Sequence, residues 1–456
     1  MSTKDTIVAI STPPGRSGIG VIRLSGTRSL EVAQCLVQDE NFRPEPNQVV
    51  LKKLYDPATH EVLDNALLTY FKSPRSFTGE DVVELSCHGS PVLLHSLIEA
   101  ILSFDLRLAG PGEFTLRALS NGRLNLIQAE AIRDLINSQT IAAAQQATRQ
   151  LGGEMSALLR PFKETLLDII VPLESSLEFV EDDLPEVAIT KFQGDLLNLI
   201  NSVEEIASTF NAGRLLKDGL KVILAGRPNV GKSSLFNRLV ASDRAIVTDI
   251  PGTTRDSLSE TINLQGIPVL LTDTAGLRVS NDLIENLGVE RTRRSIADAD
   301  LVIIIIDGSQ PLVSEDQEVF NDIGESPHII AINKCDLASF NPDTLELRGN
   351  KAMAVMSVSA KTGVGIDSLC KAILKPYMKY DTGYSGIFVT NVRHFDLLRR
   401  AITELRSSSK LLEENASEEL ILVGLYNALR FFGELTGEIT TEDILSQIFS
   451  TFCIGK

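Results

Sequence analysis

The sequence predicts a multidomain protein that combines α+β and α/β parts, and the hydrophobic pattern of its 456 residues supports this fold class. Short strand-like runs dominate the first part, helical spacing follows, and strands alternate with helices again from Leu220 to about Lys379. After that segment, the spacing of apolar residues again predicts amphipathic helices. The simplest interpretation is an N-terminal α+β domain and a discontinuous helical domain, with an α/β domain inserted between the helical halves. The length of the chain predicts about three domains, and its 43% hydrophobic residues are enough to form their cores.

The pattern also predicts individual elements. In the first part, strands are expected over 6–11, 20–26, 48–55, 66–71 and 81–86, with helices near 27–38 and 91–103. In the second, bundle-like helices are indicated by apolar residues three and four apart, such as Leu124, Ile127, Ala131 and Leu135. We therefore expect domain boundaries that give the segments 1–120, 121–217, 218–379 and 380–456.

Composition and charge narrow the class of protein. A formal net charge of -17 argues against a general surface for nucleic acid or anionic membrane, since phosphate affinity comes mainly from Lys and Arg. The five cysteines lack Cys-x-x-Cys spacing, which favours a reducing compartment. The start does not resemble a signal peptide, and the most apolar run, residues 301–306, is too short to span a bilayer. We expect a cytoplasmic protein without a membrane segment.

A phosphate-binding loop opens the inserted domain. The segment "GRPNVGKS", from Gly226 to Ser233, follows a strand-like run and precedes a helix-like one. In that context a glycine-rich loop and a helix N-terminus turn their N–H groups toward phosphate. Lys232 is expected to reach the terminal phosphates and Ser233 to bind Mg²⁺. The nucleotide contacts expected in this loop are Asn229, Val230, Gly231, Lys232, Ser233 and Ser234.

Further segments follow in the order of a guanine-nucleotide site. "DTAG" follows a strand, so Asp273 can support the magnesium shell through water while the Gly276 N–H contacts the terminal phosphate. "NKCD" and "SAK" end two other strands, and "PGTTRD" supplies Thr254 to complete the magnesium site. The nucleotide contacts expected from these segments are Thr254, Asp273, Thr274, Ala275, Gly276, Asn333, Lys334, Asp336, Ser359, Ala360 and Lys361.

Asp336 decides the expected choice of base. Its carboxylate offers two oxygens to the two adjacent N–H groups that guanine has and adenine lacks, and the Ala360 N–H would face the base carbonyl. The segments together predict a translation-factor-like GTPase domain that binds GTP and Mg²⁺.

The residue after "DTAG" departs from the plan of small GTPases. A glutamine usually orients the attacking water there, whereas this chain has Leu277, which forms no side-chain hydrogen bond. Catalysis must therefore come from elsewhere. The candidates are Asn229 in the phosphate loop, the acids Asp282 and Glu285, and the basic residues Arg255 and Arg278.

Several sequence blocks in order carry a family resemblance. "GRPNVGKSS", "AIVTDIPGTTRD", "DTAGLR" with "ENLG", and the terminal "CIGK" resemble the tRNA modification GTPases called MnmE or TrmE. "TPPGRSGIGVIRLSG", "SFTGEDVVEL" and "PGEFTLRAL" extend the match over the whole chain. The family implies an N-terminal domain similar to folate-binding aminomethyltransferase domains, a discontinuous helical domain, and an inserted P-loop GTPase domain of the Ras-like type. This division agrees with the one expected from periodicity.

The resemblance implies potassium-stimulated hydrolysis by paired GTPase domains. In that family K⁺ takes the place of an arginine finger, and its ligands correspond here to Asn229, Thr248, Ile250 and Thr253, with Asp249 in the same nucleotide-contacting loop. A fixed cation beside the phosphates offsets the charge that develops in the transition state. The family's water-orienting acid corresponds to Glu285, which we favour over Asp282. The expected catalytic residues are Glu285, Asn229 and Lys232.

The C-terminal "CIGK" allows two interpretations. Cys453 has the spacing of a prenylation signal, but the last residue, Lys456, and the acidic approach argue against a lipid anchor. The resemblance instead implies a site for 5-formyl- or 5,10-methylene-tetrahydrofolate, whose contacts correspond to Arg23, Glu80, Arg123 and Lys456, with Cys453 facing the modification chemistry. A carboxylate can accept the pterin N–H edge, and bases suit the glutamate tail. Ordinary surface charges remain the alternative for Arg23 and Glu80, and a helix-end residue for Cys453.

A second candidate nucleophile lies in "LSCHGS". Cys87 stands next to His88, but adjacent residues of a strand point to opposite faces. Catalysis by this pair is therefore the weaker interpretation.

The predicted function combines these sites. The resemblance implies a homodimer that acts with a flavoprotein of the MnmG or GidA type, as a heterotetramer, on the wobble uridine of certain tRNAs. An aminomethyl or carboxymethylaminomethyl group would be added at carbon 5 with a tetrahydrofolate carbon, while FAD and NADH lie on the partner. A ribosome-assembly GTPase and a free-standing folate-dependent aminomethyltransferase are the alternatives. The folate-type N-terminus and "CIGK" argue against the first, and the complete guanine site argues against the second.

Overall fold

The structure is a computed structural model that describes residues 5–178, 186–242, 259–273, 298–342, 351–377, 386–439 and 442–455. The chain forms two compact units. The first contains residues 1–133, 150–159 and 430–456, and the second contains residues 134–149 and 160–429. Each unit therefore combines segments that are far apart in the sequence. Among the described residues, no helix is both long and apolar enough to cross a membrane.

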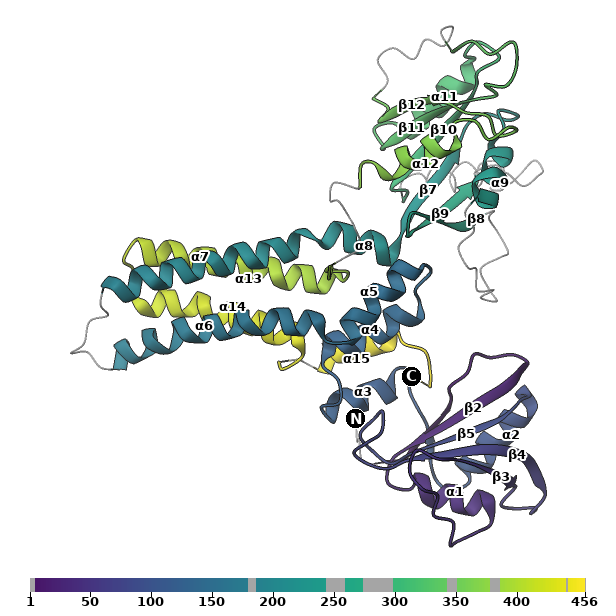
Figure 1. The fold of residues 1–456 in the computed structure, drawn as a ribbon, viewed down its shortest axis with the longest axis vertical. Coiled ribbons are helices and arrows are strands. Elements are labelled where there is room, and N and C mark those ends of the chain that lie inside the picture. The colour runs from purple at the N-terminus through teal and green to yellow at the C-terminus, as the bar shows by residue number, and fades with distance from the viewer. Residues whose placement is uncertain are drawn as a thin grey trace. The chain divides into compact units, whose positions relative to one another are not determined.

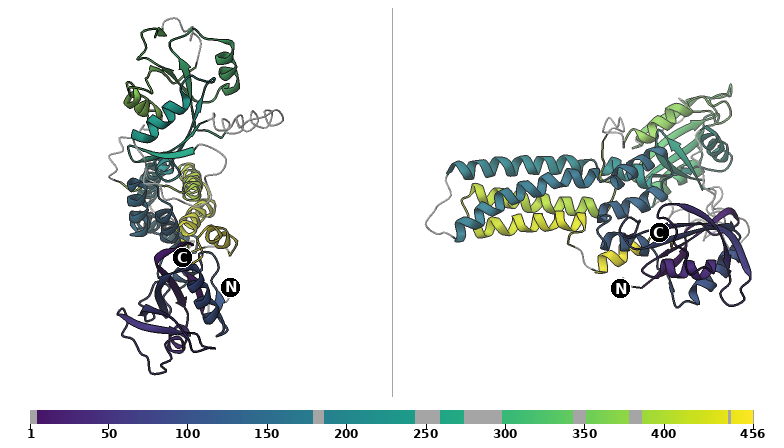
Figure 2. Two further views of the ribbon diagram at one scale, coloured as in Figure 1. Left: turned by 90° about the vertical axis from the view of Figure 1, so that its right-hand side faces the viewer. Right: turned by 60° about the horizontal axis from the view of Figure 1, so that its bottom comes forward.

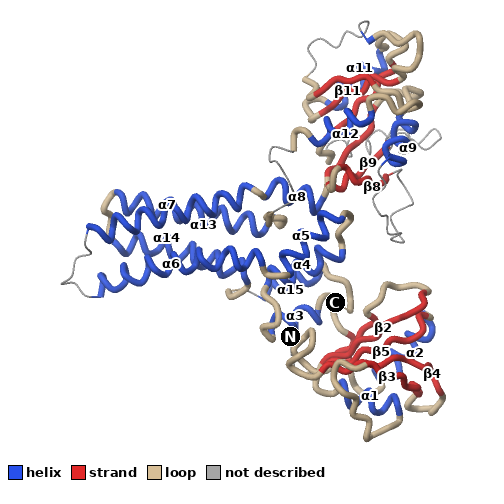
Figure 3. The backbone as a smooth tube through the Cα atoms, in the orientation of Figure 1, coloured by secondary structure: helices blue, strands red, loops and turns tan. Residues whose placement is uncertain are grey.

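The first unit contains a six-stranded, mostly antiparallel sheet in the order β3-β4-β5-β2-β1-β6. Figure 3 shows β2, β3, β4 and β5 of this sheet in red. Its strands are β1 (Ile7–Ile10), β2 (Ser17–Ser25), β3 (Val49–Tyr55), β4 (Val62–Phe71), β5 (Val82–Gly89) and β6 (Arg107–Leu108). Two helices, α1 (Ser29–Val37) and α2 (Pro91–Leu102), pack on one face, where Leu68 and Leu85 are fully buried. The strands and the two helices predicted for this part are confirmed.

The hydrophobic pattern does not predict two elements of this part, the short strand β6 and helix α3 (Glu113–Ser120). Its Phe114 is fully buried and packs with Ile7 and Ala9 of β1, on the face of the sheet opposite α1 and α2. A helix of 8 residues is not stable in water by itself, so packing rather than local propensity decides that it forms.

Helices make up the segments before and after the inserted domain, as the spacing of apolar residues predicts. They are α4 (Leu126–Ile136), α5 (Ile141–Leu151), α6 (Glu154–Glu178), α7 (Glu186–Ser208), α8 (Phe210–Asp218), α13 (Val392–Glu413), α14 (Glu418–Thr436) and α15 (Glu442–Ser450). In the second unit, α6, α7, α13 and α14 run side by side (Figures 1 and 2). The Ser176 hydroxyl donates to Glu418 at 2.6 Å, so segments from both sides of the inserted domain form one bundle.

The C-terminal tail is part of the folded first unit. Phe449 and Phe452 pack on Ala129 of α4, and Ile454 forms a β-bridge with Pro111, just before α3. The tail is therefore held by apolar packing and by the backbone at the start of α3.

The inserted domain is built on a second six-stranded sheet, in the order β12-β11-β10-β7-β9-β8. Its strands are β7 (Leu220–Ala225), β8 (Ser259–Leu264), β9 (Ile267–Asp273), β10 (Leu301–Asp307), β11 (His328–Asn333) and β12 (Ala354–Ser357). The pair β8 and β9 is antiparallel, and the other neighbours are parallel. Helices α8, α9 (Lys232–Ser242) and α12 (Ile366–Leu374) pack on one face and α11 (Ser314–Ile323) on the other. Every residue of the central strand β10 is consequently buried.

Gly112 provides a test of how the tail packs. It lies at φ +64°, and a Cβ built there would come within 2.9 Å of both Phe449 and Phe452. Gly122 has nearly the same backbone, at φ +65°, but a Cβ there meets nothing within 4 Å. Both Gly112→Ala and Gly122→Ala should lose about 1 kcal/mol to the left-handed backbone. Gly112→Ala should lose a further ~1–3 kcal/mol to overpacking.

The measurement is the thermal unfolding midpoint of each variant, together with the rate at which carboxypeptidase digests its tail. Gly112→Ala should unfold at a lower temperature and lose its tail faster than Gly122→Ala. Equal midpoints and equal digestion rates would contradict the packing of the tail against the start of α3.

Candidate functional site

The phosphate loop connects β7 to α9. The ammonium group of Lys232 donates to the carbonyls of Gly226 and Arg227, at 2.7 and 2.9 Å. Gly231, at φ +100°, is required because a Cβ there would lie 2.3 Å from the amide nitrogen of Asn333. An ammonium group has three donors, so a bound phosphate can replace these carbonyls, which suits Lys232 for the terminal phosphates.

Ser233 and Asp273 come from different elements and meet directly. Ser233 lies in the first turn of α9, Asp273 ends β9, and the hydroxyl donates to the carboxylate at 2.8 Å. Asp273 is fully buried. Hydroxyl and carboxylate oxygens are among the ligands that Mg²⁺ prefers, so this pair suits the ion.

A buried amide joins the phosphate loop to the base-binding segments. Asn333, the last residue of β11, donates from Nδ2 to the Val230 carbonyl at 2.8 Å and accepts the Ala360 N–H at Oδ1 at 3.0 Å. Its side chain is buried, so both ends of the amide are used within the protein. The sequence predicts Asn333 as a nucleotide contact, and in the structure its side chain bridges two loops of the site.

Asp336 presents the carboxylate expected to select guanine. The Ser359 hydroxyl donates to its Oδ1 at 2.6 Å, and this bond holds the pKa of Asp336 below its ordinary value. The carboxylate is therefore ionised at neutral pH and accepts hydrogen bonds only. Lys334, in the same segment, pairs with Asp307 of β10 at 2.6 Å.

Arg238 belongs to none of the sequence motifs, but it also fixes the segment that contains Ala360 and Lys361. From α9 it donates to the carbonyls of Ala360, at 3.1 Å, and of Lys361. Because Arg238 lies in an ordinary amphipathic helix, only the fold reveals this contact.

Three of the other predicted nucleotide contacts are exposed, namely Asn229, Ser234 and Lys361. The backbone of Asn229 lies at φ 64°.

Several predicted site residues lie outside the described residues. Among the predicted contacts and catalytic residues these are Thr248, Asp249, Ile250, Thr253, Thr254, Thr274, Ala275, Gly276, Glu285 and Lys456. Among the other residues discussed for hydrolysis they are Arg255, Leu277, Arg278 and Asp282.

In the first unit, Arg23 of β2 connects the sheet to the tail. It pairs with Glu84 of β5 at 2.7 Å, and its Nη1 donates to the Gly455 carbonyl at 3.4 Å. The guanidinium also lies over two aromatic rings, 5.8 Å from the centre of Phe77 and 5.7 Å from that of Phe114. Arg23 is therefore in contact with the sheet, α3 and the tail at once.

Glu80 and Arg123 lie close to this position. The hydroxyl of Ser25, two residues along β2 from Arg23, donates to Glu80 at 2.7 Å. Arg123 packs beside Gly79, where a Cβ would lie 3.3 Å from its Cγ. Cys453 is exposed. Arg23 thus contacts the tail, while Glu80 bonds to Ser25 of the same strand and Arg123 lies beside Gly79.

The strand pair Cys87 and His88 does not form a nucleophile and base. Cys87 is buried, and burial raises the pKa of its thiol to about 12. His88 points to the opposite face, where its Nδ1 bonds to Asp64 at 2.7 Å. The prediction that strand alternation separates the two side chains is confirmed.

A guanine-nucleotide-binding GTPase domain is defined by the mostly parallel sheet, the glycine-rich loop with Lys232, the pair of Ser233 and Asp273, and the ionised Asp336. The model of the MnmE helical domain matches residues 126–453, a range that includes this inserted domain, and that of the GTP-binding protein TrmE N-terminus matches residues 6–123. The chain belongs to the MnmE family of tRNA modification GTPases. It is therefore a GTP hydrolase, and the predicted fold class is confirmed.

Similar proteins cover the whole chain. It is 42% identical to the tRNA modification GTPase MnmE of Koribacter versatilis, over 100% of this chain and 100% of that one. It is also 42% identical to the tRNA modification GTPase MnmE of Aquifex aeolicus, over 99% of this chain and 100% of that one. Among solved structures, a variant of Era from Aquifex aeolicus bound to GDP and aluminium fluoride is 26% identical, with a TM-score of 0.29, over 41% of this chain and 66% of that one.

Asp336→Asn tests the base preference. The amide replaces one carboxylate oxygen by a donor, so one N–H of guanine would face another N–H. Affinity for GTP should fall by ~100-fold, since a lost hydrogen bond and an unpaired donor together are worth about 3 kcal/mol. Affinity for XTP, which has a carbonyl at that edge, should rise.

Competition binding with a fluorescent nucleotide measures both affinities. Asp367→Asn makes the same chemical change at an exposed position of α12 and should leave both unchanged. If Asp336→Asn bound GTP as tightly as the parent chain, the role of Asp336 in base selection would be wrong.

Proposed function

We propose that this chain hydrolyses GTP, together with a flavoprotein partner of the MnmG or GidA type, to modify the wobble uridine of certain tRNAs. An aminomethyl or carboxymethylaminomethyl group would be built at carbon 5 with a carbon from 5,10-methylene-tetrahydrofolate, and FAD and NADH would bind to the partner. One observation carries the proposal. A chain of this family combines a nucleotide site that carries Asp336 with a second polar site, where Arg23 contacts the "CIGK" tail and Glu80 bonds to Ser25 of the same strand.

In the nucleotide site, each described residue has a task. Asp336 and the Ala360 N–H would bind the guanine, while Lys232 and the loop N–H groups would bind the phosphates. Ser233 would hold Mg²⁺ together with Thr254, and Asp273 would support the ion through water. Bound Mg²⁺ supplies positive charge that stabilises the phosphoryl oxygens during transfer.

Potassium would complete the catalytic machinery. Asn229 is exposed in the phosphate loop, and with Thr248, Ile250 and Thr253 it would bind the ion when two GTPase domains pair. Glu285 would orient the attacking water, because Leu277 has no group that can do so. A cation in this position stabilises the charge of the transition state without any side chain from an activating protein.

The potassium proposal predicts a salt-specific rate. At equal ionic strength, hydrolysis should be at least ~10-fold faster in potassium chloride than in sodium chloride, because a fixed charge at the transition state is worth several kcal/mol. Asn229→Ala should remove the difference. Asn198→Ala, at an exposed position of α7, is the matched control and should keep it. Steady-state release of phosphate measures the rates, and equal rates in both salts would contradict potassium stimulation.

In the second site, the residues suit a reduced folate. Glu80 would accept the N–H edge of the pterin, and Arg23, Arg123 and Lys456 would bind the carboxylates of the glutamate tail. Arg23 and the tail are already in contact, which supports a shared ligand. Cys453 would face the modification chemistry, and its exposure is compatible with that role.

The assembly is proposed from the first unit. The face of its sheet that α1 and α2 leave open carries exposed apolar side chains, including Ile19, Leu51 and Leu67, which supports a homodimer formed through this face. The net charge of -17 supports a partner that supplies much of the tRNA-binding surface, in a cytoplasmic heterotetramer. We retain the domain segments 1–120, 121–217, 218–379 and 380–456 as part of this proposal.

Nucleoside analysis tests the reaction itself. Mass spectrometry of tRNA from cells that lack this protein should show loss of wobble aminomethyl-type uridines. Wild type and Asp282→Ala should restore them, whereas Glu285→Ala should not, because hydrolysis would be blocked. If these nucleosides never change, the tRNA proposal is wrong and a ribosome-assembly GTPase becomes the better account. If Asp282→Ala does not restore these nucleosides and Glu285→Ala does, the assignment of Glu285 as the catalytic acid is wrong.

A further inference from the structure

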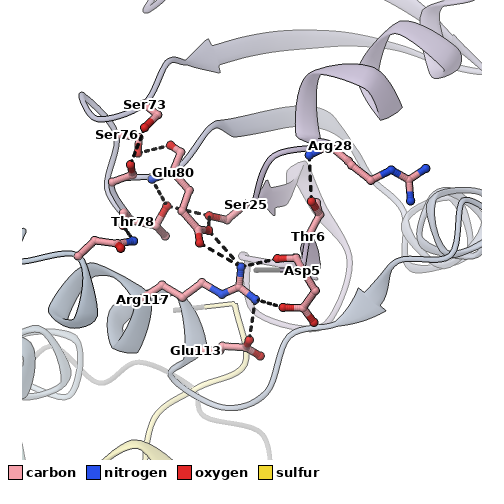
Figure 4. Close-up of polar contacts among 12 residues, drawn as sticks. Asp5, Thr6, Ser25, Arg28, Ser73, Ser76, Thr78, Glu80, Glu113 and Arg117 are labelled. Carbon is pink, nitrogen blue, oxygen red and sulfur yellow. Dashed lines mark hydrogen bonds and ion pairs between the residues drawn. The ribbon is translucent and has the colours of Figure 1, made fainter. Parts of the chain in front are cut away.

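A guanidinium group lies buried at the centre of the first unit. Arg117 of α3 is only 1% exposed and pairs with three carboxylates, at 2.8 Å from Asp5, 3.1 Å from Glu80 and 3.0 Å from Glu113 (Figure 4). Its Nη1 also donates to the Asp5 carbonyl at 2.6 Å. The family resemblance does not give Arg117 a role, and its burial requires partners, since an unpaired charge in the interior is strongly destabilising.

The carboxylates of this cluster fall into two groups. Asp5 and Glu113 share a second guanidinium, that of Arg107, at 2.6 and 2.5 Å. Burial acts to raise the pKa of both acids, but their bonds to Arg107 and Arg117 outweigh it, so each pKa lies below its ordinary value. Arg117 is the cation that also reaches Glu80, whereas Arg107 bonds to Asp5 and Glu113.

The carboxylate of Glu80 accepts hydrogen bonds from Ser25 and Arg117. Ser25 donates to its Oε2 at 2.7 Å, and Nη1 of Arg117 donates to Oε1 and Oε2 at 3.3 and 3.1 Å. Its backbone is also fixed, because its carbonyl accepts the Ser76 hydroxyl at 2.5 Å and its N–H donates to Thr78 at 3.2 Å. A carboxylate has about four acceptor positions. The bonds from Ser25 and Arg117 fix how this carboxylate points and leave acceptor positions that a ligand can use. The Glu80 side chain keeps 17% of its surface exposed.

We propose that Arg117 is a positioning residue for folate recognition, which acts by orienting the carboxylate of Glu80 toward the N–H edge of the pterin. This inference rests on the folate site proposed above. The planar guanidinium points Nη1 at Glu80 and Nη2 at Asp5 and Glu113, so one rigid group serves both sides of the cluster. A lysine carries the same charge but has no such fork, so it cannot hold all three carboxylates in these orientations.

The experiment compares two conservative changes in the full-length protein. Calorimetry measures binding of 5-formyl-tetrahydrofolate to wild type, Arg117→Lys and Arg107→Lys. Arg107 belongs to the same cluster but bonds to Asp5 and Glu113, so it is the matched control. Arg117→Lys should bind the folate ~10-fold more weakly, the size of one misplaced charge-assisted hydrogen bond. Arg107→Lys should stay within about twofold.

A double-mutant cycle separates positioning from a merely structural role. If Arg117 acts through Glu80, then Glu80→Gln should already remove its benefit, and Arg117→Lys with Glu80→Gln should bind no more weakly than Glu80→Gln alone. If Arg117 supports only the fold, the two losses should multiply and the inference would be wrong.

A charge-matched variant keeps the test usable if Arg117→Lys does not fold. Arg117→Met combined with Glu113→Gln removes one cation and one anion, so the net charge of the cluster is unchanged. It should also bind the folate ~10-fold more weakly. Wild-type affinity in either Arg117 variant would overturn the inference and leave the folate site standing. A wild-type chain that binds no folate would overturn both.

Discussion

The nucleotide site depends on one geometric constraint, namely that the carboxyl ends of parallel strands lie at the same edge of a sheet. The phosphate loop follows β7, Asp273 ends β9, Asn333 ends β11, and Ser359 stands just after β12. The constraint brings together segments that are more than a hundred residues apart, and the bridge of Asn333 to Val230 and Ala360 is its direct result. The central strands β10 and β11 are buried on both faces, so the apolar core stabilises a site whose own groups are polar.

The first unit follows a different rule, in which charge rather than strand direction holds distant segments together. The carboxylates around Arg117 come from the start of the chain, the loop before β5, and α3. Because a buried cation that loses a partner is costly, these three segments cannot move independently. Apolar packing adds the tail to the same assembly through Phe449 and Phe452. The first unit thus combines segments from both ends of the chain.

Much of both sites can be predicted from residue types. "NKCD" requires an acid to distinguish guanine, and Asp336 is an ionised acceptor held by Ser359. The strands and long helices follow from periodicity because each must bury one face. Helix α3 does not, since its few residues form a helix only against β1. Arg238 and Arg117 escape prediction for a related reason. Each stands in a helix without a motif of its own, and most of its partners are distant in sequence.

The sequence by itself therefore determined the class of most elements and the chemistry available to the nucleotide site. These properties are local, since they depend on spacing along a helix or strand and on a few adjacent side chains. The tertiary structure decided which distant groups meet. It placed Ser11 against Gly455 and set a buried Arg117 behind Glu80. Such contacts have no local signal, because their free energy arises only when packing removes both partners from water.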